Sequence, residues 1–398
     1  MTGVLFLTES FHPVLGGGEG HIRHLSGRLI AAGLRASVLT RRIDTAWPAM
    51  EMLDGVRVLR VGPSGAGRRG KYAMVGPALA ALRRERRSFD VLVVRGTRVL
   101  GLPGVAAARA LGKAVVLQPE LNGEMSGEVY TWGTRLHVPA VRRAVGTGTA
   151  ARNLLLRDAD AFVAMSRAIA AECLAAGAPP ERIVRLPHGV DTDRFSPASP
   201  GEKRALRARY GLPESRVIAT YTGRLLRGKG LEALVDAFAS LAAEQPRVHL
   251  MIVGSGEGQT LSVEGELKDS VRRRGLGDRV TFTGRVDDVA ERLRASDLFV
   301  FPSEFEALGI SLIEAAACGL PAIGARTGGI VDVIEDGASG LLVAPGDTSA
   351  LLLAMRALAT DSERRLQMGA RARQIARDRF DMDDSVARYV ALFRELRG

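Results

Sequence analysis

Short apolar runs alternate with longer helical stretches from one end of this sequence to the other. The first half holds seven such runs, which are VLFLTE, ASVLT, VRVLRVG, DVLVVRG, AVVLQPE, AFVAMS and RIVRLP. The second half holds six, which are RVIATYTG, HLMIVG, VTFTG, LFVFP, PAIGA and GLLVA. Strands that alternate with helices form parallel sheets. Because 398 residues exceed one typical domain, the pattern predicts an α/β protein with two domains of about 190 residues each.

A glycine-bearing loop, GRLLRGKG at 223–230, follows the apolar run RVIATYT. The next stretch has apolar residues at helical spacing, which are Leu231, Leu234, Val235, Phe238 and Leu241. Arg224 and Lys229 therefore lie in a loop between a strand and a helix. Two cations in such a loop suit a phosphate group, and we expect them to bind a phosphorylated ligand.

Two glutamates eight residues apart follow another apolar run, DLFVFP. We expect Glu306 in the loop after this strand and Glu314 about two turns into the next helix, about 12 Å along its axis. The N–H groups that open this helix form an anion site, and they belong to Leu308, Gly309, Ile310 and Ser311. Acceptors on both sides of an anion site match a sugar nucleotide. The alternative is two glutamates that contact only solvent.

Four further segments complete the pattern, which are PHGVDTDRFSP (187–197), HLMIVGSGEG (249–258), RVTFTGRVDD (279–288) and TGGIVDVIEDGASGLLVAPGD (327–347). In this order, the segments resemble the retaining glycosyltransferase family 4, also called glycosyl transferases group 1. The resemblance implies the GT-B fold, in which two Rossmann-like domains face each other across a cleft. It implies an acceptor domain over 1–195, a nucleotide-sugar donor domain over 196–380, and a last helix at 381–398 that packs back onto the first domain.

The resemblance also implies roles for the residues of the donor domain. Arg224, Lys229 and the helix N-terminus at Gly309 to Ser311 would stabilise the departing diphosphate. Glu306 would hold sugar hydroxyls, and Glu314 would hold the ribose diol. Two further positions, Arg285 and Val286, would face the base through their backbone.

The first glycine cluster, FHPVLGGGEG at 11–20, lies in the acceptor domain. Gly16 and Gly17 match family positions that approach a phosphate or the transferred sugar. An ordinary turn before a helix is the alternative. The resemblance implies a UDP- or GDP-linked hexosyl donor, retention of anomeric configuration and no metal or other cofactor.

The clearest departure from the family lies at 115–130, VVLQPELNGEMSGEVY, where many members have a histidine near the transferred sugar. This sequence offers Gln118, Glu120, Asn122 and Glu124 instead. Glu124 is our candidate for a sugar or acceptor contact, and a loop-capping role is the alternative. His188 also departs from the family, and we expect it to be structural.

Charge is distributed unevenly. The net charge is +11, and 27 basic against 16 acidic side chains in residues 1–195 account for all of it. Residues 196–398 hold 28 of each. The basic clusters are Arg68-Arg69-Gly70-Lys71, Arg83-Arg84-Glu85-Arg86-Arg87 and Arg142-Arg143. An anionic acceptor or an anionic membrane is the functional interpretation, and a solvated surface is the alternative. We expect no nucleic acid, since no aromatic residues interleave with the arginines.

Several classes of protein are not expected. There is no uncharged apolar run of 18 residues and no signal-peptide pattern. Cys173 and Cys318 suggest buried thiols in a cytoplasmic protein, and the basic first half suggests a peripheral position at the inner membrane face as one alternative. No metal-ligand spacing is present. The alternatives are an oxidoreductase with two Rossmann domains, which would leave the loop cations and glutamates without a role, and a non-catalytic sugar-nucleotide sensor.

Overall fold

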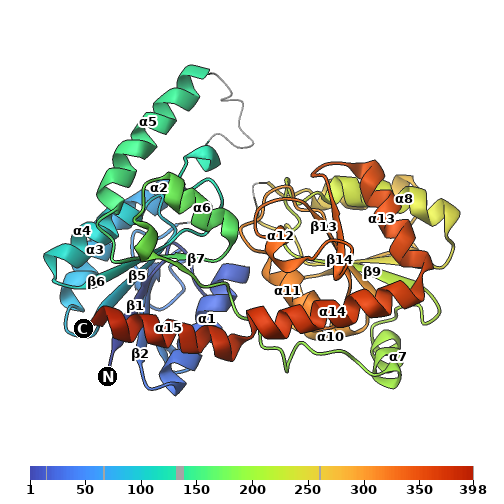
Figure 1. The fold of residues 1–398 in the computed structure, drawn as a ribbon, viewed down its shortest axis with the longest axis horizontal. Coiled ribbons are helices and arrows are strands. Elements are labelled where there is room, and N and C mark those ends of the chain that lie inside the picture. Colours follow the sequence, from blue (N-terminus) through green and yellow to red (C-terminus); the bar gives the residue numbers. More distant parts are fainter. Residues whose placement is uncertain (15, 66–67, 131–138, 260, 398) are drawn as a thin grey trace. The chain divides into compact units, whose positions relative to one another are not determined.

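Two compact units make up the chain in the computed structural model (Figure 1). The structure describes residues 1–14, 16–65, 68–130, 139–259 and 261–397, without the side chains of 68, 69, 129 and 139–144. Unit 1 comprises Met1–Gly189 and Asp383–Gly398, and unit 2 comprises Val190–Met382. Each unit has its own sheet, as the alternating pattern predicted.

The described strands of unit 1 form one sheet in the order β3-β4-β2-β1-β5-β6-β7-β8. They are β1 (Gly3–Leu7), β2 (Arg35–Arg41), β3 (Met50–Leu53), β4 (Val56–Val61), β5 (Val91–Arg95), β6 (Ala114–Gln118), β7 (Ala161–Ala164) and β8 (Ile183–Arg185). The helices are α1 (Gly17–Ala31), α2 (Arg68–Ala73), α3 (Val75–Arg84), α4 (Gly101–Ala110), α5 (Pro139–Leu156), α6 (Arg167–Ala175) and α15 (Met382–Arg397), with short 3-10 turns at η1 (Glu128–Tyr130) and η2 (Pro180–Arg182). All seven apolar runs of this half form strands.

Strand β3 was not expected, and it is the one strand of this sheet that pairs antiparallel, with β4. Its sequence, MEML, has no β-branched residue, so its strand propensity is weak. Asp54 and Gly55 join β3 to β4 with φ angles of 51° and 79°. Asp-Gly with both residues at positive φ is the strongest short-range signal for a hairpin. The Asp54-Gly55 dipeptide was therefore the sequence signal that could have predicted the hairpin of β3 and β4.

Helix α15 packs against unit 1, although it follows unit 2 in the chain. Phe393 meets Phe6 of β1 edge to face, with ring centroids 6.4 Å apart. The boundary between the two units falls at Gly189, six residues before the expected one. Val190 pairs with the end of α14 (Ser362–Phe380) in unit 2: its N–H donates to Phe380 O at 2.8 Å, and Met382 N–H donates to Val190 O at 3.1 Å. Arg373 adds bonds to the carbonyls of Thr192 and Phe195.

The described strands of unit 2 form a parallel sheet in the order β11-β10-β9-β12-β13-β14. They are β9 (Val217–Thr222), β10 (Val248–Val253), β11 (Val280–Gly284), β12 (Leu298–Phe301), β13 (Ala322–Ala325) and β14 (Gly340–Val343). The helices are α7 (Pro200–Arg209), α8 (Leu231–Glu244), α9 (Glu264–Arg273), α10 (Val289–Arg294), α11 (Ile310–Ala317), α12 (Ile330–Val333), α13 (Thr348–Thr360) and α14 (Ser362–Phe380). The five apolar residues predicted for α8 are all buried.

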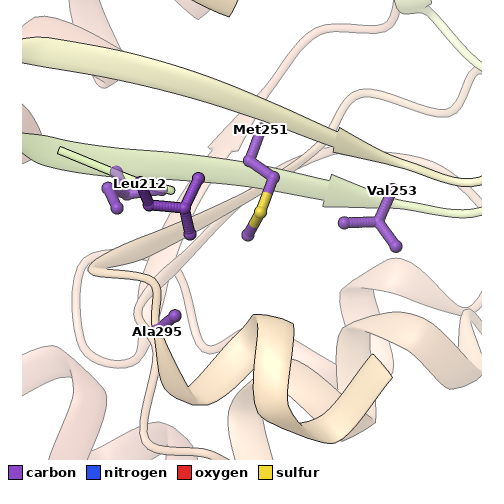
Figure 2. Packing of buried hydrophobic residues seen from close by; sticks show 5 residues of the cluster. Leu212, Met251, Val253 and Ala295 are labelled. Atoms are coloured by element: carbon purple, nitrogen blue, oxygen red, sulfur yellow. The ribbon is translucent and has the colours of Figure 1, made fainter. Parts of the chain in front are cut away.

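A hydrophobic cluster under the sheet of unit 2 includes Leu212, Met251, Val253 and Ala295 (Figure 2). Met251 and Val253 are two residues apart on β10, so their side chains point to the same face. Val286 packs against this cluster from the loop after β11. The cluster therefore anchors a loop at the carboxyl edge of the sheet.

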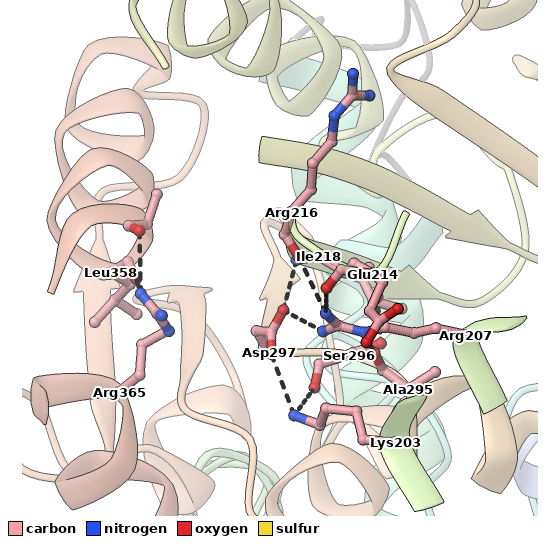
Figure 3. A network of polar contacts seen from close by, with 12 residues as sticks. Lys203, Arg207, Glu214, Arg216, Ile218, Ala295, Ser296, Asp297, Leu358 and Arg365 are labelled. Carbon is pink, nitrogen blue, oxygen red and sulfur yellow. Dashed lines mark hydrogen bonds and ion pairs between the residues drawn. The ribbon is translucent and has the colours of Figure 1, made fainter. Parts of the chain in front are cut away.

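A polar network holds α7 to the other end of the sheet (Figure 3). The Asp297 carboxylate accepts bonds from the Arg207 guanidinium at 2.5 Å and from Ile218 N–H at 2.8 Å. Lys203 donates to Ser296 O at 2.7 Å. Since a buried guanidinium is stabilised only when it is paired, this network fixes the amino ends of β9 and β12.

Candidate active site

The two loops that carry the predicted phosphate and sugar contacts follow neighbouring strands. Strands β9 and β12 pair in parallel, with Ala219 opposite Leu298. From β9 the chain first continues to β10 and β11 on one side, and later to β13 and β14 on the other side. The sheet order therefore reverses between β9 and β12. Ligands of open α/β sheets bind beyond the carboxyl ends of the strands at such a switch point.

Main-chain contacts hold the loops after β9 and β12 together. Glu304 N–H donates to Gly228 O at 3.0 Å. Gly230 has a φ of 67°, and a Cβ there would lie 2.1 Å from Pro302 O. Glycine is thus required at 230 for conformation and for close approach. The glycine at the end of GRLLRGKG, which predicted this loop, is therefore explained by the close approach of Gly230 to Pro302.

Lys229 and Glu306 form an ion pair across these loops, with Nζ and Oε2 2.8 Å apart. Their side chains are 21% and 17% exposed, so both remain accessible to a ligand. The sequence predicted separate roles for the two residues, one on phosphate and one on sugar hydroxyls. In this structure each is the partner of the other, which keeps two half-buried charges neutralised.

Arg224 lies on the same loop and is exposed, with no ion pair to a described residue. The buried Tyr221 hydroxyl donates to Arg224 O at 3.1 Å. Burial and the nearby Glu306 raise the pKa of Tyr221, which keeps its hydroxyl protonated as a donor. The backbone of Arg224 is therefore fixed, while its guanidinium remains available.

Helix α11 begins at Ile310, with Gly309 as its N-cap at a φ of 90° and no side-chain cap. Leu308 is buried, and Ser311 lies in the open first turn. The prediction placed Glu314 too far along the helix, because α11 begins only at Ile310, after the left-handed turn at Gly309. Glu314 is only four residues beyond Ile310, which is about 6 Å along the axis. Burial raises the pKa of Glu314 to about 7, and Arg194 opposes that shift.

Three more glycine turns line the carboxyl edge of unit 2. Gly254 N–H donates to Gly284 O at 2.9 Å, and Gly223 N–H donates to Val253 O at 3.0 Å. A Cβ at Gly254 would lie 1.9 Å from Gly223 O. These contacts bring the exposed Arg285 and the partly buried Val286 to the same edge as Arg224. The predicted base-facing backbone therefore shares an edge with the loops after β9 and β12.

In unit 1, Gly16 is the N-cap of α1 and Gly17 its first residue, and no side chain caps this end. Ser10 Oγ donates to Glu19 Oε1 at 2.6 Å, and a Cβ at Gly16 would lie 2.3 Å from Glu19 Oε2. The Glu19 carboxylate thus lies beside the helix N-terminus, where a negative charge is stabilised. The two predicted glycines belong to unit 1, and the rest of the predicted donor set belongs to unit 2.

Glu124 is enclosed rather than presented to a ligand. The residue is only 1% exposed. Its Oε2 accepts hydrogen bonds from Thr97 N–H at 2.7 Å and from Thr97 Oγ1 at 3.1 Å. Burial raises the pKa of Glu124 to about 7. This geometry favours the loop-capping alternative, because the carboxyl fixes the end of β5 instead of facing a substrate.

Sequence reasoning missed the residues that hold the loop around Glu124. Glu172 of α6 accepts bonds from the N–H groups of Gly123, Met125 and Ser126, at 2.7 to 2.8 Å. Asn153 of α5 donates to Met125 O at 2.7 Å. These contacts join segments that are distant in sequence, so no local motif predicts them.

His188 is buried, as a structural role predicts. Its ring stacks on His21 with centroids 3.9 Å apart, and its Nε2 lies 3.3 Å from Gln118 Nε2. Desolvation lowers the pKa of both histidines well below the usual value. Both rings are therefore neutral, which allows them to stack.

The basic clusters are described only in part. The side chains of Arg68, Arg69, Arg142 and Arg143 lie outside the described residues. Arg83, Arg84, Arg86 and Arg87 are exposed on and just after α3, and none forms an ion pair with a described residue. Among the helices that the structure describes, none combines the length and apolar character needed to cross a bilayer.

Comparison with solved structures gives the class of fold. Anabaena HepE in complex with UDP and glucose matches with a TM-score of 0.79 at 24% identity, over 99% of this chain and 100% of that chain. Its two sheets, parallel apart from the pairing of β3, have glycine turns at their carboxyl edges, and the protein has the GT-B fold of glycosyltransferases.

Family comparisons go further. Residues 15–194 match Glycosyltransferase Family 4, and residues 202–375 match Glycosyl transferases group 1. The D-inositol 3-phosphate glycosyltransferase of Geodermatophilus obscurus is 30% identical over 399 residues, which cover 96% of this chain and 86% of the relative. The N-acetyl-alpha-D-glucosaminyl L-malate synthase of Bacillus anthracis is 30% identical over 69% of this chain and 71% of that protein. The chain belongs to glycosyltransferase family 4, and the oxidoreductase alternative is wrong.

Proposed function

We propose that this enzyme transfers a hexosyl unit from a UDP- or GDP-linked donor to an acceptor hydroxyl, with retention of anomeric configuration. The observation that carries the proposal is the ion pair between Lys229 and Glu306, beside the open N-terminus of α11 at the switch point of unit 2. One cation, one hydroxyl acceptor and one anion site on two touching loops match a sugar diphosphate. UDP is the first nucleotide to test, since the HepE complex contains UDP and glucose.

In the proposed mechanism the diphosphate replaces Glu306 as the partner of Lys229. The departing oxygens gain negative charge, which Lys229, Arg224 and the N–H groups at the start of α11 stabilise. Glu306, released from Lys229, then holds hydroxyls of the transferred sugar. This exchange gives a reason for the pairing of two residues that have separate roles in the reaction.

The remaining residues bind the rest of the donor. Glu314 accepts bonds from the ribose diol, and the backbone at Arg285 and Val286 faces the base. Gly16 and Gly17 offer backbone N–H groups from unit 1. A leaving phosphate oxygen takes the acceptor proton on the same face of the sugar, so the carboxylate pair of a glycosidase is not needed. Fixed cations and the helix provide the charge stabilisation, and we propose that no metal is required.

For the acceptor we propose an anionic molecule or one presented at an anionic membrane. The relatives compared above are named for inositol 3-phosphate and L-malate, which both carry negative charge. A groove of about 600 Å³ in unit 1 has Val61, Pro77 and Ala80 on its walls, with Arg83, Arg84 and Arg86 beside them. Two unpaired buried thiols, Cys173 and Cys318, are consistent with action in the cytoplasm.

The test is a panel of UDP-, GDP- and ADP-linked hexoses, with release of nucleoside diphosphate measured with and without cell extract as the acceptor source. Release that increases with extract, and a product whose anomeric proton matches that of the donor, support the proposal. An inverted product contradicts retention. Donor binding without release under any condition supports the sensor alternative. Addition of EDTA tests metal independence, and no change in rate is expected.

A further inference from the structure

A buried arginine lies at the carboxyl edge of the unit 1 sheet. Arg95 is the last residue of β5, and it lies opposite Gln118, the last residue of β6. Its side chain is 1% exposed. An enclosed guanidinium is costly unless it has both a counter-charge and hydrogen-bond partners. The partners of Arg95 therefore indicate why a charge is kept in this place.

Arg95 has two partners, and both lead to the predicted acceptor region. One guanidinium nitrogen donates to Gly18 O at 2.9 Å, in the first turn of α1. Another forms an ion pair with Oε1 of Glu120, two residues beyond β6. Arg95 thus ties the glycine-rich start of α1 to the loop after β6.

Glu120 differs from its partner in exposure. Its side chain is 29% exposed, but Oε1 is buried against Arg95, so Oε2 is the oxygen that a ligand would meet. A Cβ at Gly18 would lie 3.2 Å from Glu120 Oε2. The absence of a side chain at 18 therefore leaves room for this second oxygen beside the first turn of α1.

Two other polar residues of this loop, Gln118 and Glu124, are bonded elsewhere. The Gln118 amide donates to Tyr389 of α15 at 3.3 Å and contacts His188. Glu124 is enclosed by Thr97. Glu120 therefore combines an accessible carboxylate with an orientation set by a buried partner.

We propose that Glu120 is the substrate contact that replaces the missing family histidine, and that its carboxylate accepts a hydrogen bond from an acceptor hydroxyl. Arg95 is its positioning residue, since it fixes the carboxylate and the glycine loop together. Carboxylates suit this task, because their bonds to hydroxyl groups are charge-assisted and short. The inference rests on the proposed transfer to a hydroxyl, and it assigns that step to Glu120 instead of Glu124.

The test compares wild type with Glu120→Gln in the full chain, using UDP-glucose as donor and inositol 3-phosphate and L-malate as acceptor probes. We expect transfer to fall about 10- to 100-fold, mainly through a higher acceptor KM, which is the loss for one hydrogen bond to a charged group. Donor hydrolysis without acceptor should stay within about twofold. Glu128→Gln is the matched control, since Glu128 is exposed on the same segment.

Arg95→Lys tests the positioning role. Lysine keeps the charge and pairs with Glu120, but it lacks the fork that reaches the Gly18 carbonyl at the same time. We expect an acceptor KM between those of wild type and Glu120→Gln. Circular dichroism shows whether each variant folds.

Transfer by Glu120→Gln within twofold of wild type overturns the role of Glu120. An equal loss of donor hydrolysis also overturns it, since the contact then involves the donor. If wild type uses neither probe, the proposed acceptor class is wrong. The two proteins are then compared on the acceptor in cell extract, where equal transfer overturns the role of Glu120 by itself.

Discussion

The carboxyl edges of the two sheets are built from different materials. In unit 2 the loops of the edge are held together mainly by main-chain contacts, because glycine turns contact one another directly and Gly309 opens a helix with no side-chain cap. In unit 1 the edge consists of side chains, with Arg95, Glu120, Glu124 and Glu172 bonded to loops from distant segments. A substitution can remove a side-chain contact of the unit 1 edge, whereas the glycine contacts of unit 2 come from the backbone. In the reaction that we propose, this difference suits a common donor and a variable acceptor.

The largest expected effect comes from removing a cation from the loop after β9 in unit 2. Arg224→Ala or Lys229→Ala should each lower turnover by about 100-fold or more, because one lost transition-state donor costs about 2.7–4 kcal/mol. Arg227→Ala is the control on the same loop, since Arg227 is exposed and pairs with Glu266. Steady-state kinetics on folded variants decide the question. Near-normal turnover in both variants removes these residues from the site.

The next prediction separates the two glutamates of unit 2. Glu306→Gln should lower kcat by about 10- to 100-fold with little change in UDP affinity, because Glu306 holds the reacting sugar. Glu314→Gln should weaken UDP binding by a similar factor, because we propose that Glu314 holds the ribose. Isothermal titration with UDP and turnover measurements separate the two roles. If UDP affinity falls more in Glu306→Gln, the roles are reversed.

Wild-type affinity for UDP should also depend on pH near neutrality. Burial raises the pKa of Glu314 to about 7, and the ribose diol donates to the ionised form. Binding therefore favours loss of a proton, and affinity should rise as pH increases from 6 to 8. In Glu314→Gln this part of the pH dependence should be absent. Equal slopes in both proteins would show that another group titrates.

A smaller effect concerns the stability of unit 1. Burial lowers the pKa of His21 and His188, so the unfolded chain binds protons that the folded chain does not. Stability from these groups is present above the unfolded pKa of about 6.5 and is lost as pH falls below it. Each histidine should cost about 1 kcal/mol at pH 5.5.

His21→Leu tests this effect, since it removes one titrating ring. Its melting temperature should fall less between pH 7 and pH 5.5 than that of wild type. Glu124 opposes the trend, because its raised pKa makes the folded state bind a proton in the same range. The difference between the two proteins cancels that contribution. Parallel melting curves would contradict the prediction.

The smallest expected effect concerns the charge difference between residues 1–195 and 196–398, and it is tested by the salt dependence of binding. Exposed charges are screened over about 8 Å at physiological ionic strength. Added salt should therefore weaken binding of the acceptor or of anionic liposomes while changing donor affinity less. Changing Arg83, Arg84, Arg86 and Arg87 to glutamate should act in the same direction at low salt. Liposome sedimentation and acceptor titration at two salt concentrations measure it, and insensitivity in both returns these arginines to a solvated surface.

Prediction from sequence succeeded where the signal was local. The loop at 223–230 was placed correctly between a strand and a helix. Gly230 adopts a positive φ and lies close to Pro302, and only glycine meets both requirements, so the sequence shows a glycine there. The same reasoning placed Gly309 at the start of a helix. It could not separate the two roles considered for Glu124, because a glutamate in a polar loop gives the same sequence signal whether it faces a substrate or the N–H of Thr97, 27 residues away.

The sequence by itself determined the alternation of strands and helices, the glycine turns and the loop positions of Arg224, Lys229 and Glu306 in unit 2. These follow from backbone conformation and periodicity, which act over a few residues. Only the tertiary structure decided that Lys229 pairs with Glu306 and that Glu120 is accessible where Glu124 is enclosed. Those outcomes depend on which distant segments lie side by side, since burial and pairing arise only when the chain is packed.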